Sequence, residues 1–291
     1  MTFGMPSTSH SILHKIIMSI LIFLKFSDKA LEEWPPFLRE EFMKSIVKCN
    51  NSSAPGPDKL LWSHLKYIIN NEVCLSKIIS IANACFELGL WLVHFKSSTT
   101  IVILKPNKKS YNSSKSFQPI ILLNILGKLI KKVIGKHLQF HLIVNDFIYL
   151  CQLGDLKQRS TLDVGIALTY FIHSEWTRNN MISMLVFNIT QFFLSLNHQL
   201  LLLILKKAGC YTKVVYFFSN YLVGRKTQYS WNNFSSQFFN IDISMGQGSA
   251  LSPILSVLYI LSVFHILEKC WKNLKIPVSF LSFVNNSLFI A

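Results

Sequence analysis

Residues 278–290, VSFLSFVNNSLFI, consist of two short apolar runs on either side of Asn285 and Asn286. Phe, Val and Ile favour extended strands, and asparagine tolerates the positive φ angles that a tight connection between two strands requires. The stretch therefore predicts a β-hairpin with the two asparagines at its turn. Residues 181–187 form another apolar run and predict a buried strand.

The rest of the chain alternates between helical and extended patterns. Residues 99–104, TTIVIL, are rich in β-branched side chains and predict a strand, and residues 226–243 predict a pair of strands. Two prolines and one glycine exclude a helix through residues 50–58. Helices are predicted at residues 62–90, 126–138, 162–176, 197–207 and about 253–269. The order of elements indicates an α+β fold with helices on one face of an antiparallel sheet.

The chain is strongly basic. It has 29 Lys and Arg against 14 Asp and Glu, a formal net charge of +15. No acidic residue occurs between Glu87 and Asp146, whereas this stretch contains Lys96, Lys105, Lys108, Lys109, Lys115, Lys128, Lys131, Lys132 and Lys136. A solvated lysine-rich face is one interpretation. Because these cations have no local counter-charge, we expect a surface that binds a polyphosphate such as nucleic acid.

One predicted helix combines an apolar face with a cationic face. Its apolar side chains follow the i, i+3, i+4, i+7 rule at Leu126, Leu129, Ile130, Val133, Ile134 and Leu138. Four lysines fall outside this stripe, at Lys128, Lys131, Lys132 and Lys136. The pattern predicts that the stripe is buried and that the lysines face outward.

The six cysteines are scattered and form no CxxC pair, so the sequence indicates neither a zinc knuckle nor a disulfide framework. We expect an intracellular, reduced protein, in the cytoplasm or the nucleus. Residues 1–30 form a separate N-terminal lead-in. Residues 249–267 carry no formal charge and are long enough to span a bilayer, which leaves a membrane protein as an alternative.

Six blocks of the sequence, in this order, resemble the polymerase region of non-LTR (LINE-type) retrotransposon reverse transcriptases, from about residue 31 to the end. One of these blocks is a long lysine-containing segment made of two motifs, and the other five are short motifs. They are APGPD at 54–58, FKSSTTIVILKPNKKSY with FQPIILLNILGK at 95–128, QLGDLKQRST at 152–161, FNITQFFLSLNH at 187–198, GQGSALSP at 246–253 and FVNN at 283–286.

The resemblance implies an incomplete right-hand polymerase. Fingers are expected at residues 31–160 and a palm at 161–291, with a ferredoxin-like palm sheet that carries helices on one face. The family's thumb and endonuclease are not expected in this chain, which stops at the palm hairpin. The block at 246–253 places the start of the long apolar helix in the palm, which favours a buried helix over a membrane span.

The resemblance also implies that the polymerase chemistry is lost. The family holds two Mg²⁺ ions with three aspartates, and the matching positions here are Asn188, Asn285 and Asn286. Magnesium is a hard cation that is usually held by carboxylates and substrate phosphates. Because an amide has no negative charge, we expect that Mg²⁺ is not bound productively and that the domain is catalytically inactive.

Further positions match residues that contact nucleotide or nucleic acid in the family. Gln118 stands where the family has an arginine that can clamp the triphosphate, and Phe193 stands where an aromatic excludes the ribose 2′-hydroxyl. The nucleotide-binding candidates are Lys105, Lys108, Gln118, Phe193 and Gln247. The nucleic-acid-binding candidates are Lys128, Lys131, Lys132, Lys136 and Arg159, although Ser160 and Thr161 beside Arg159 equally suit a helix start.

Two hypotheses follow for the function. The first is a relic RNA-directed DNA polymerase domain of a retrotransposon, with RNA and DNA template–primer as the partners that the resemblance implies. The second is a noncatalytic nucleic-acid-binding protein that uses the lysine-rich fingers surface. Binding that weakens steeply with salt would support the second hypothesis.

Overall fold

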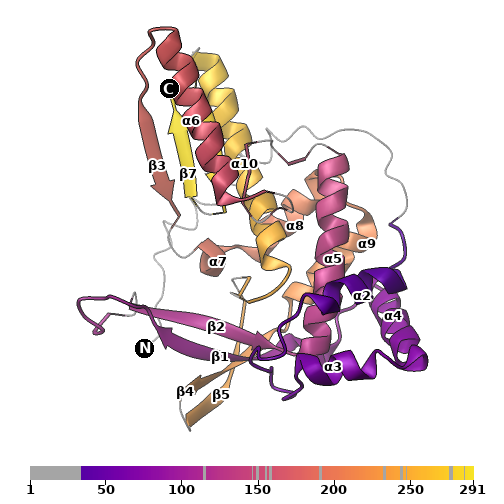
Figure 1. Ribbon diagram of the computed structural model, residues 1–291. Coiled ribbons are helices and arrows are strands. Elements are labelled where there is room, and N and C mark those ends of the chain that lie inside the picture. Colours follow the sequence, from indigo (N-terminus) through magenta and orange to yellow (C-terminus); the bar gives the residue numbers. More distant parts are fainter. Residues whose placement is uncertain are drawn as a thin grey trace.

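The computed structural model describes most of the chain from Trp34 onward and arranges it around two separate β-sheets (Figure 1). The described residues are 34–113, 116–145, 147–148, 151–154, 156, 159–189, 192–231, 234–242, 245–246, 248–274, 278–284 and 286–291. The turn residue Asn285 and the loop residue Gln247 therefore lie outside the described residues.

The larger sheet has four strands in the order β2-β1-β4-β5. β1 (Ser97–Leu104) pairs antiparallel with β2 (Phe117–Leu123) and parallel with β4 (Lys226–Trp231), which pairs antiparallel with β5 (Phe234–Asn240). The predicted strand pair at 226–243 is confirmed. One of its strands, β4, pairs with β1, which precedes residue 160 in the sequence. Hydrogen bonds of this sheet therefore connect the expected fingers region to the expected palm region.

The smaller sheet has three strands in the order β3-β7-β6. β6 (Ser279–Phe283) and β7 (Asn286–Ile290) form the predicted hairpin, and β3 (Met184–Asn188) lies antiparallel to β7. The predicted turn position is wrong by one residue. Phe283 pairs with Asn286, so positions 284 and 285 connect the strands and Asn286 begins β7. Val284 has φ 57°, a conformation that is rare for a β-branched residue.

The central helix of the molecule is α5 (Ile125–Val144), which α2 (Arg39–Val47) and α3 (Trp62–Ile68) contact. The predicted apolar stripe is confirmed as core, because Leu129, Ile130, Val133, Ile134 and Leu138 have no exposed surface. Three further helices add side chains to the same core: α4 (Glu72–Glu87), α8 (His198–Lys207) and α9 (Thr212–Leu222).

The single helix predicted at residues 62–90 is divided into α3 and α4. The break occurs because Asn71 acts as the N-cap of a new helix, and its side chain accepts a hydrogen bond from the Cys74 amide at 3.1 Å. Asparagine favours such caps because its short side chain competes for backbone donors. A similar cap, formed by Ser160 with Asp163, begins α6 (Thr161–Thr177), which confirms the helix-start interpretation for Ser160.

The long apolar helix is α10 (Ser252–Leu274), and it lies between the smaller sheet and the helical core (Figure 1). Several of its side chains are buried in that core, among them Leu255, Leu258 and Leu261. By length and composition α10 could cross a bilayer. One such helix is weak support for a membrane protein, because buried core helices have the same properties.

Candidate functional site

The smaller sheet brings two of the three predicted metal positions together. Asn188 is the last residue of β3 and Asn286 is the first of β7, and the two face each other in the antiparallel register. The Asn188 amide Nδ2 donates a hydrogen bond to Asn286 Oδ1 at 2.6 Å, and both side chains are exposed. The predicted proximity of positions 188 and 286 is therefore confirmed.

These two side chains do not fit a pair of Mg²⁺ ions. The amide oxygen of Asn286 accepts a hydrogen bond from Asn188 Nδ2, so one lone pair of the oxygen that would face a cation is already engaged. Neither amide carries the negative charge that offsets the cost of dehydrating Mg²⁺. Over the described part of the chain, no group of three or more His, Cys, Asp or Glu side chains could hold a metal ion.

Phe193 lies next to this sheet edge on the short helix α7 (Phe192–Ser195). Its carbonyl oxygen accepts a hydrogen bond from the Met245 amide at 2.8 Å, which ties α7 to the loop that precedes α10. The neighbouring Phe192 is buried, and its ring centre lies 5.7 Å from that of Phe193. The structure thus fixes the backbone at Phe193 from two sides.

The loop at residues 245–249 packs closely on the larger sheet. Gly248 has φ 110°, and a Cβ atom there would lie 2.7 Å from the carbonyl oxygen of Ile121 in β2. Gly246 has φ 65°, and its Cβ would lie 2.7 Å from the Ile121 side chain. Both glycines are therefore required by backbone conformation and by close approach.

Two other glycines of the sequence blocks also mark close approaches. A Cβ atom on Gly56 would lie 2.4 Å from the Leu123 carbonyl carbon at the end of β2. One on Gly154 would lie 2.3 Å from the Val284 amide in the hairpin turn. The APGPD and QLGD blocks thus dock onto the ends of the two sheets, which gives both glycines a structural role.

The predicted nucleotide contacts of the fingers lie on the β1–β2 hairpin of the larger sheet. Gln118 pairs with Ile103, and Lys105 follows β1 and is partly buried. Lys108 is exposed in the connection between the two strands. The structure groups these three residues on one hairpin and places them on a different sheet from Asn188 and Asn286.

The predicted outward cationic face of α5 is wrong at Lys131. This side chain is 1% exposed, and burial lowers the pKa of its ammonium. Lys128 is partly buried, and its pKa is lowered by burial although Asp58 opposes the shift. Neighbouring elements cover other sides of this helix besides its apolar stripe. Its lysines therefore contact these elements.

The other two lysines of α5 contact elements from the N-terminal part of the chain. Lys132 Nζ lies 2.9 Å from Cys49 Sγ and 5.1 Å from the ring centre of Trp62. Lys136 donates a hydrogen bond to the Ser45 hydroxyl on α2. Both remain partly exposed. Their role in nucleic-acid binding stays a prediction.

Arg159 also makes a structural contact. Its guanidinium donates a hydrogen bond to the carbonyl oxygen of Gln152. Gln152 forms a parallel bridge with Ser282, and the Leu153 amide donates to the Ser282 carbonyl at 2.8 Å. Arg159 therefore helps to hold a short segment against the outer edge of β6.

The sequence interpretation missed Lys44 and Lys48. These two side chains of the α2 region line a cleft of about 260 Å³ together with Lys132 and Lys136 of α5. We call these four residues the Lys cleft; its lining, over the part of the chain that the structure describes, contains no acidic side chain. The i, i+4 spacing of lysines in both helices was the available signal, since it places each pair on one helix face.

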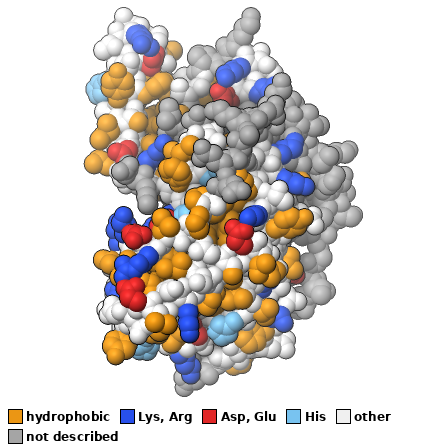
Figure 2. All heavy atoms as spheres, turned by 90° about the vertical axis from the view of Figure 1, so that its right-hand side faces the viewer, with side chains coloured by type: hydrophobic (Ala, Val, Ile, Leu, Met, Phe, Trp, Pro, Cys, Tyr) orange, Lys and Arg blue, Asp and Glu red, His pale blue; other side chains and the backbone are white. Residues whose placement is uncertain are grey.

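Basic side chains are not gathered in the same way everywhere. On the face that looks to the right in Figure 1, Lys and Arg are interspersed with Asp and Glu (Figure 2). Exposed ion pairs such as Arg39–Glu72 and Lys213–Glu87 also bring opposite charges together at the surface. On the face shown in Figure 2, basic side chains therefore have acidic neighbours.

Comparison with known proteins identifies the family. A family model described as reverse transcriptase (RNA-dependent DNA polymerase) matches residues 103–285. The chain belongs to the reverse transcriptase family. The family match includes Asn188, position 285 and the loop before α10, and it ends one residue before Asn286, so the predicted resemblance is confirmed.

A curated relative and a solved structure agree with this reverse transcriptase assignment. The chain is 24% identical over 226 residues to a probable RNA-directed DNA polymerase from transposon X-element of Drosophila melanogaster. The match includes 77% of this chain and 24% of the relative, so the chain spans about a quarter of that protein.

An apo telomerase from Candida tropicalis, truncated from its C-terminal domain, superposes with a TM-score of 0.50 at 15% identity. That match covers 68% of this chain and 44% of the telomerase, and it confirms the α+β polymerase fold.

Proposed function

We propose that this chain is a reverse transcriptase domain of a retrotransposon that has lost polymerase activity. The observation that carries the proposal is the hydrogen bond between the Asn188 and Asn286 amides at 2.6 Å. Position 285, the third that the family fills with aspartate, is also asparagine. Three negative charges are therefore absent from a site that has to concentrate two divalent cations and a triphosphate.

Electrostatics explains why the amides are inadequate. A carboxylate attracts a divalent cation through its full charge, and this attraction is strong where protein excludes water. An amide offers one dipolar oxygen, and here that of Asn286 already accepts a hydrogen bond from Asn188. Gln118 adds to the loss, because a neutral amide replaces the arginine that would contact the triphosphate.

Primer extension with Mg²⁺ and with Mn²⁺ tests the proposal. We expect no product from the natural chain on an RNA template with a DNA primer, and processive synthesis would overturn the proposal. Metal affinity is measured separately by Mn²⁺ titration with electron paramagnetic resonance. The variant Asn188→Asp/Asn285→Asp/Asn286→Asp should bind Mn²⁺ where the natural chain does not.

A charge-matched control separates site geometry from net charge. The control is the triple variant Asn51→Asp/Asn70→Asp/Asn112→Asp. It adds the same number of negative charges at three exposed positions away from the smaller sheet. We expect this control to bind Mn²⁺ no better than the natural chain. Equal Mn²⁺ affinity of the two triple variants would contradict the assignment of positions 188, 285 and 286 to the former metal site.

The Lys cleft favours a second function, the binding of RNA or of an RNA–DNA hybrid without catalysis. Four lysines line one hollow, and none of its described lining residues is acidic. Exposed Lys44 and Lys48 can approach phosphates directly, and each phosphate that is neutralised releases bound counterions. The affinity should therefore fall steeply with salt.

Fluorescence anisotropy with a labelled RNA–DNA hybrid at several salt concentrations measures this dependence. Lys44→Gln/Lys48→Gln should weaken binding and reduce the slope of log K against log salt by about 0.7–0.9 for each lost contact. The matched control is Lys77→Gln/Lys269→Gln, which removes two exposed lysines that do not line the cleft. Equal slopes for the two double variants would exclude the Lys cleft as the binding surface.

A further inference from the structure

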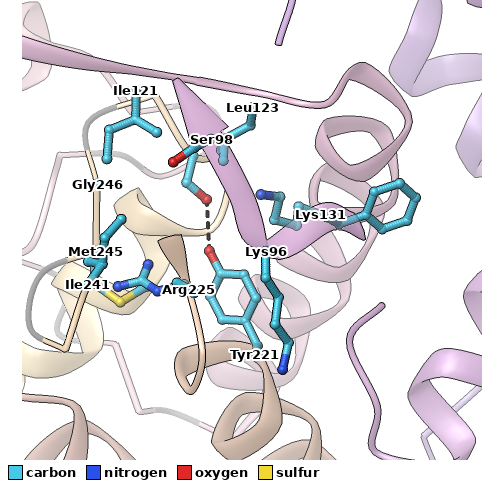
Figure 3. A pocket seen from close by; sticks show the side chains of 12 residues that line it. Lys96, Ser98, Ile121, Leu123, Lys131, Tyr221, Arg225, Ile241, Met245 and Gly246 are labelled. Atoms are coloured by element: carbon cyan, nitrogen blue, oxygen red, sulfur yellow. Dashed lines mark hydrogen bonds between the residues drawn. The ribbon is translucent and has the colours of Figure 1, made fainter. Parts of the chain in front are cut away.

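Two buried cations flank one tyrosine at the junction of α5, α9 and β4 (Figure 3). Lys131 Nζ lies 5.6 Å from the ring centre of Tyr221, and Arg225 Cζ lies 5.8 Å from the same centre. Lys131 is 1% exposed and Arg225 is 8% exposed. Burial of a charged side chain is unfavourable unless an opposite charge accompanies it.

The described surroundings supply aromatic rings to Lys131 but no carboxylate. Its Nζ lies 5.6 Å from the ring centre of Trp91 as well as from that of Tyr221. Among the described residues its ammonium forms no ion pair with Asp or Glu. Cation–π contacts contribute about 2 kcal/mol when desolvated, whereas burial of an ion costs several kcal/mol even after relaxation. The rings alone therefore leave the buried charge undercompensated.

A small cavity adjoins both cations. Its volume is about 20 Å³, and its lining includes Lys131, Arg225, Ser98 and Ser249 (Figure 3). About 10–15 Å³ by this measure admits one water molecule, so the cavity has room for one water or one ion of similar size. Phosphate and sulfate are larger than this space.

The serine hydroxyls complete a polar lining. Ser249 Oγ lies 3.2 Å from the Tyr221 hydroxyl, and Ser98 Oγ donates to the carbonyl oxygen of Lys226 at 3.0 Å. Lys96 also lines the cavity, but its Nζ donates to the Asn220 carbonyl oxygen at 2.7 Å. No acidic residue is among the described residues that line the cavity.

We propose that this cavity binds one small monovalent anion, of the size of chloride or bromide, beside Lys131 and Arg225. The anion compensates the buried ammonium charge of Lys131, lies beside the Arg225 guanidinium and accepts hydrogen bonds from the surrounding donors. Although burial opposes ionisation of Tyr221, the two cations lower the pKa of its hydroxyl, which is a further sign of local positive potential. The cavity lies beneath Gly246 and Ser249, so the anion stabilises the loop that precedes α10.

Thermal unfolding of the full chain at constant ionic strength tests the proposal. In mixtures of chloride and gluconate, the midpoint of the natural chain should rise with the logarithm of the chloride concentration. Lys131→Met removes the buried cation and should abolish this chloride dependence. Lys77→Met makes the same substitution at an exposed position on α4 and should retain it. Equal chloride dependence in all three proteins would overturn the proposal.

Two further measurements do not depend on the folding of a variant. Crystals of the natural chain soaked in bromide should show an anomalous scattering peak next to Lys131 Nζ, and its absence would overturn the proposal. The ultraviolet absorbance of the folded protein near neutral pH should show no tyrosinate. A tyrosinate band that disappears in Tyr221→Phe would mean that Tyr221 itself supplies the negative charge, and this also would overturn the anion site.

Discussion

The helical core around α5 and the smaller sheet differ in how completely they are packed. Leu129, Val133 and Leu138 of α5 have no exposed surface, whereas every residue of β3 is exposed, with Val186 at 71%. α6 lies against this sheet and buries none of its residues. An apolar cleft of about 670 Å³ separates the β3–β7 side of the sheet from α10. The free energy of folding is therefore concentrated in the core, and the sheet that carries the candidate site depends on it.

The largest expected effect is a truncation in the core. Leu138→Ala should lower the free energy of unfolding by about 2–5 kcal/mol, because a fully buried side chain leaves a cavity when it is shortened. Val186→Ala in β3 should change it by less than about 1 kcal/mol, since that side chain is mostly in water already. Urea denaturation followed by circular dichroism measures both. Equal losses would contradict the proposed concentration of stability in the core.

A smaller loss is expected where the N-terminal part of the chain docks onto the larger sheet. Gly56→Ala places a methyl group 2.4 Å from backbone atoms of Leu123, which have to move. We expect a loss of about 1–3 kcal/mol, as for other overpacked positions. Denaturation of the purified variant gives the value. An unchanged midpoint would mean that the APGPD segment is free to shift away from β2.

The opposite sign is expected for the corresponding change in α6. Gly165 lies within the helix, and a Cβ atom there would meet no atom within 4 Å. Gly165→Ala should raise stability by about 0.5–1 kcal/mol, because alanine loses less conformational entropy in a helix. If α6 unfolds before the core, the free energy of global unfolding will not change. Hydrogen exchange in residues 161–177 has to be measured as well. No slowing of exchange there would contradict the prediction.

The smallest effect is a pH dependence at the end of α5. Burial lowers the pKa of His141 below its usual 6.5, so the unfolded chain binds a proton more readily than the folded chain does. Stability from this group is fully present above pH 6.5 and is lost as the pH falls through the lowered pKa. His141→Phe should show a weaker loss of stability between pH 7 and pH 5 than the natural chain. Parallel pH profiles would contradict this.

The sequence predicts those features that depend on local periodicity. The apolar stripe of α5 and the hairpin strands follow from spacing alone, and the family resemblance aligned positions 188 and 286, which the sheet indeed brings together. The turn was misplaced because two asparagines suit a turn better than Val284 does. The structure puts Val284 there with positive φ nevertheless, so sheet pairing outweighs the local preference.

Features that depend on distant contacts were not predictable in the same way. Helix periodicity shows that Lys131 is off the apolar stripe, but not that Trp91 and Tyr221 cover that side of α5. Likewise, no local pattern indicates that β4 pairs with β1. The paired residues Ser97 and Lys226 are more than 120 positions apart in the sequence. Such pairings depend on the topology of the whole chain.

The contact between Asn188 and Asn286 also changes the mechanics of the sheet edge. Two carboxylates at that separation would repel each other whenever no cation lies between them. A working site would therefore be destabilised by this repulsion until it binds metal. Two amides attract each other and link the outer strand to the hairpin without any ion. The asparagines on which the proposed loss of catalysis rests would thus remove this repulsion and hold the edge of the sheet more tightly closed.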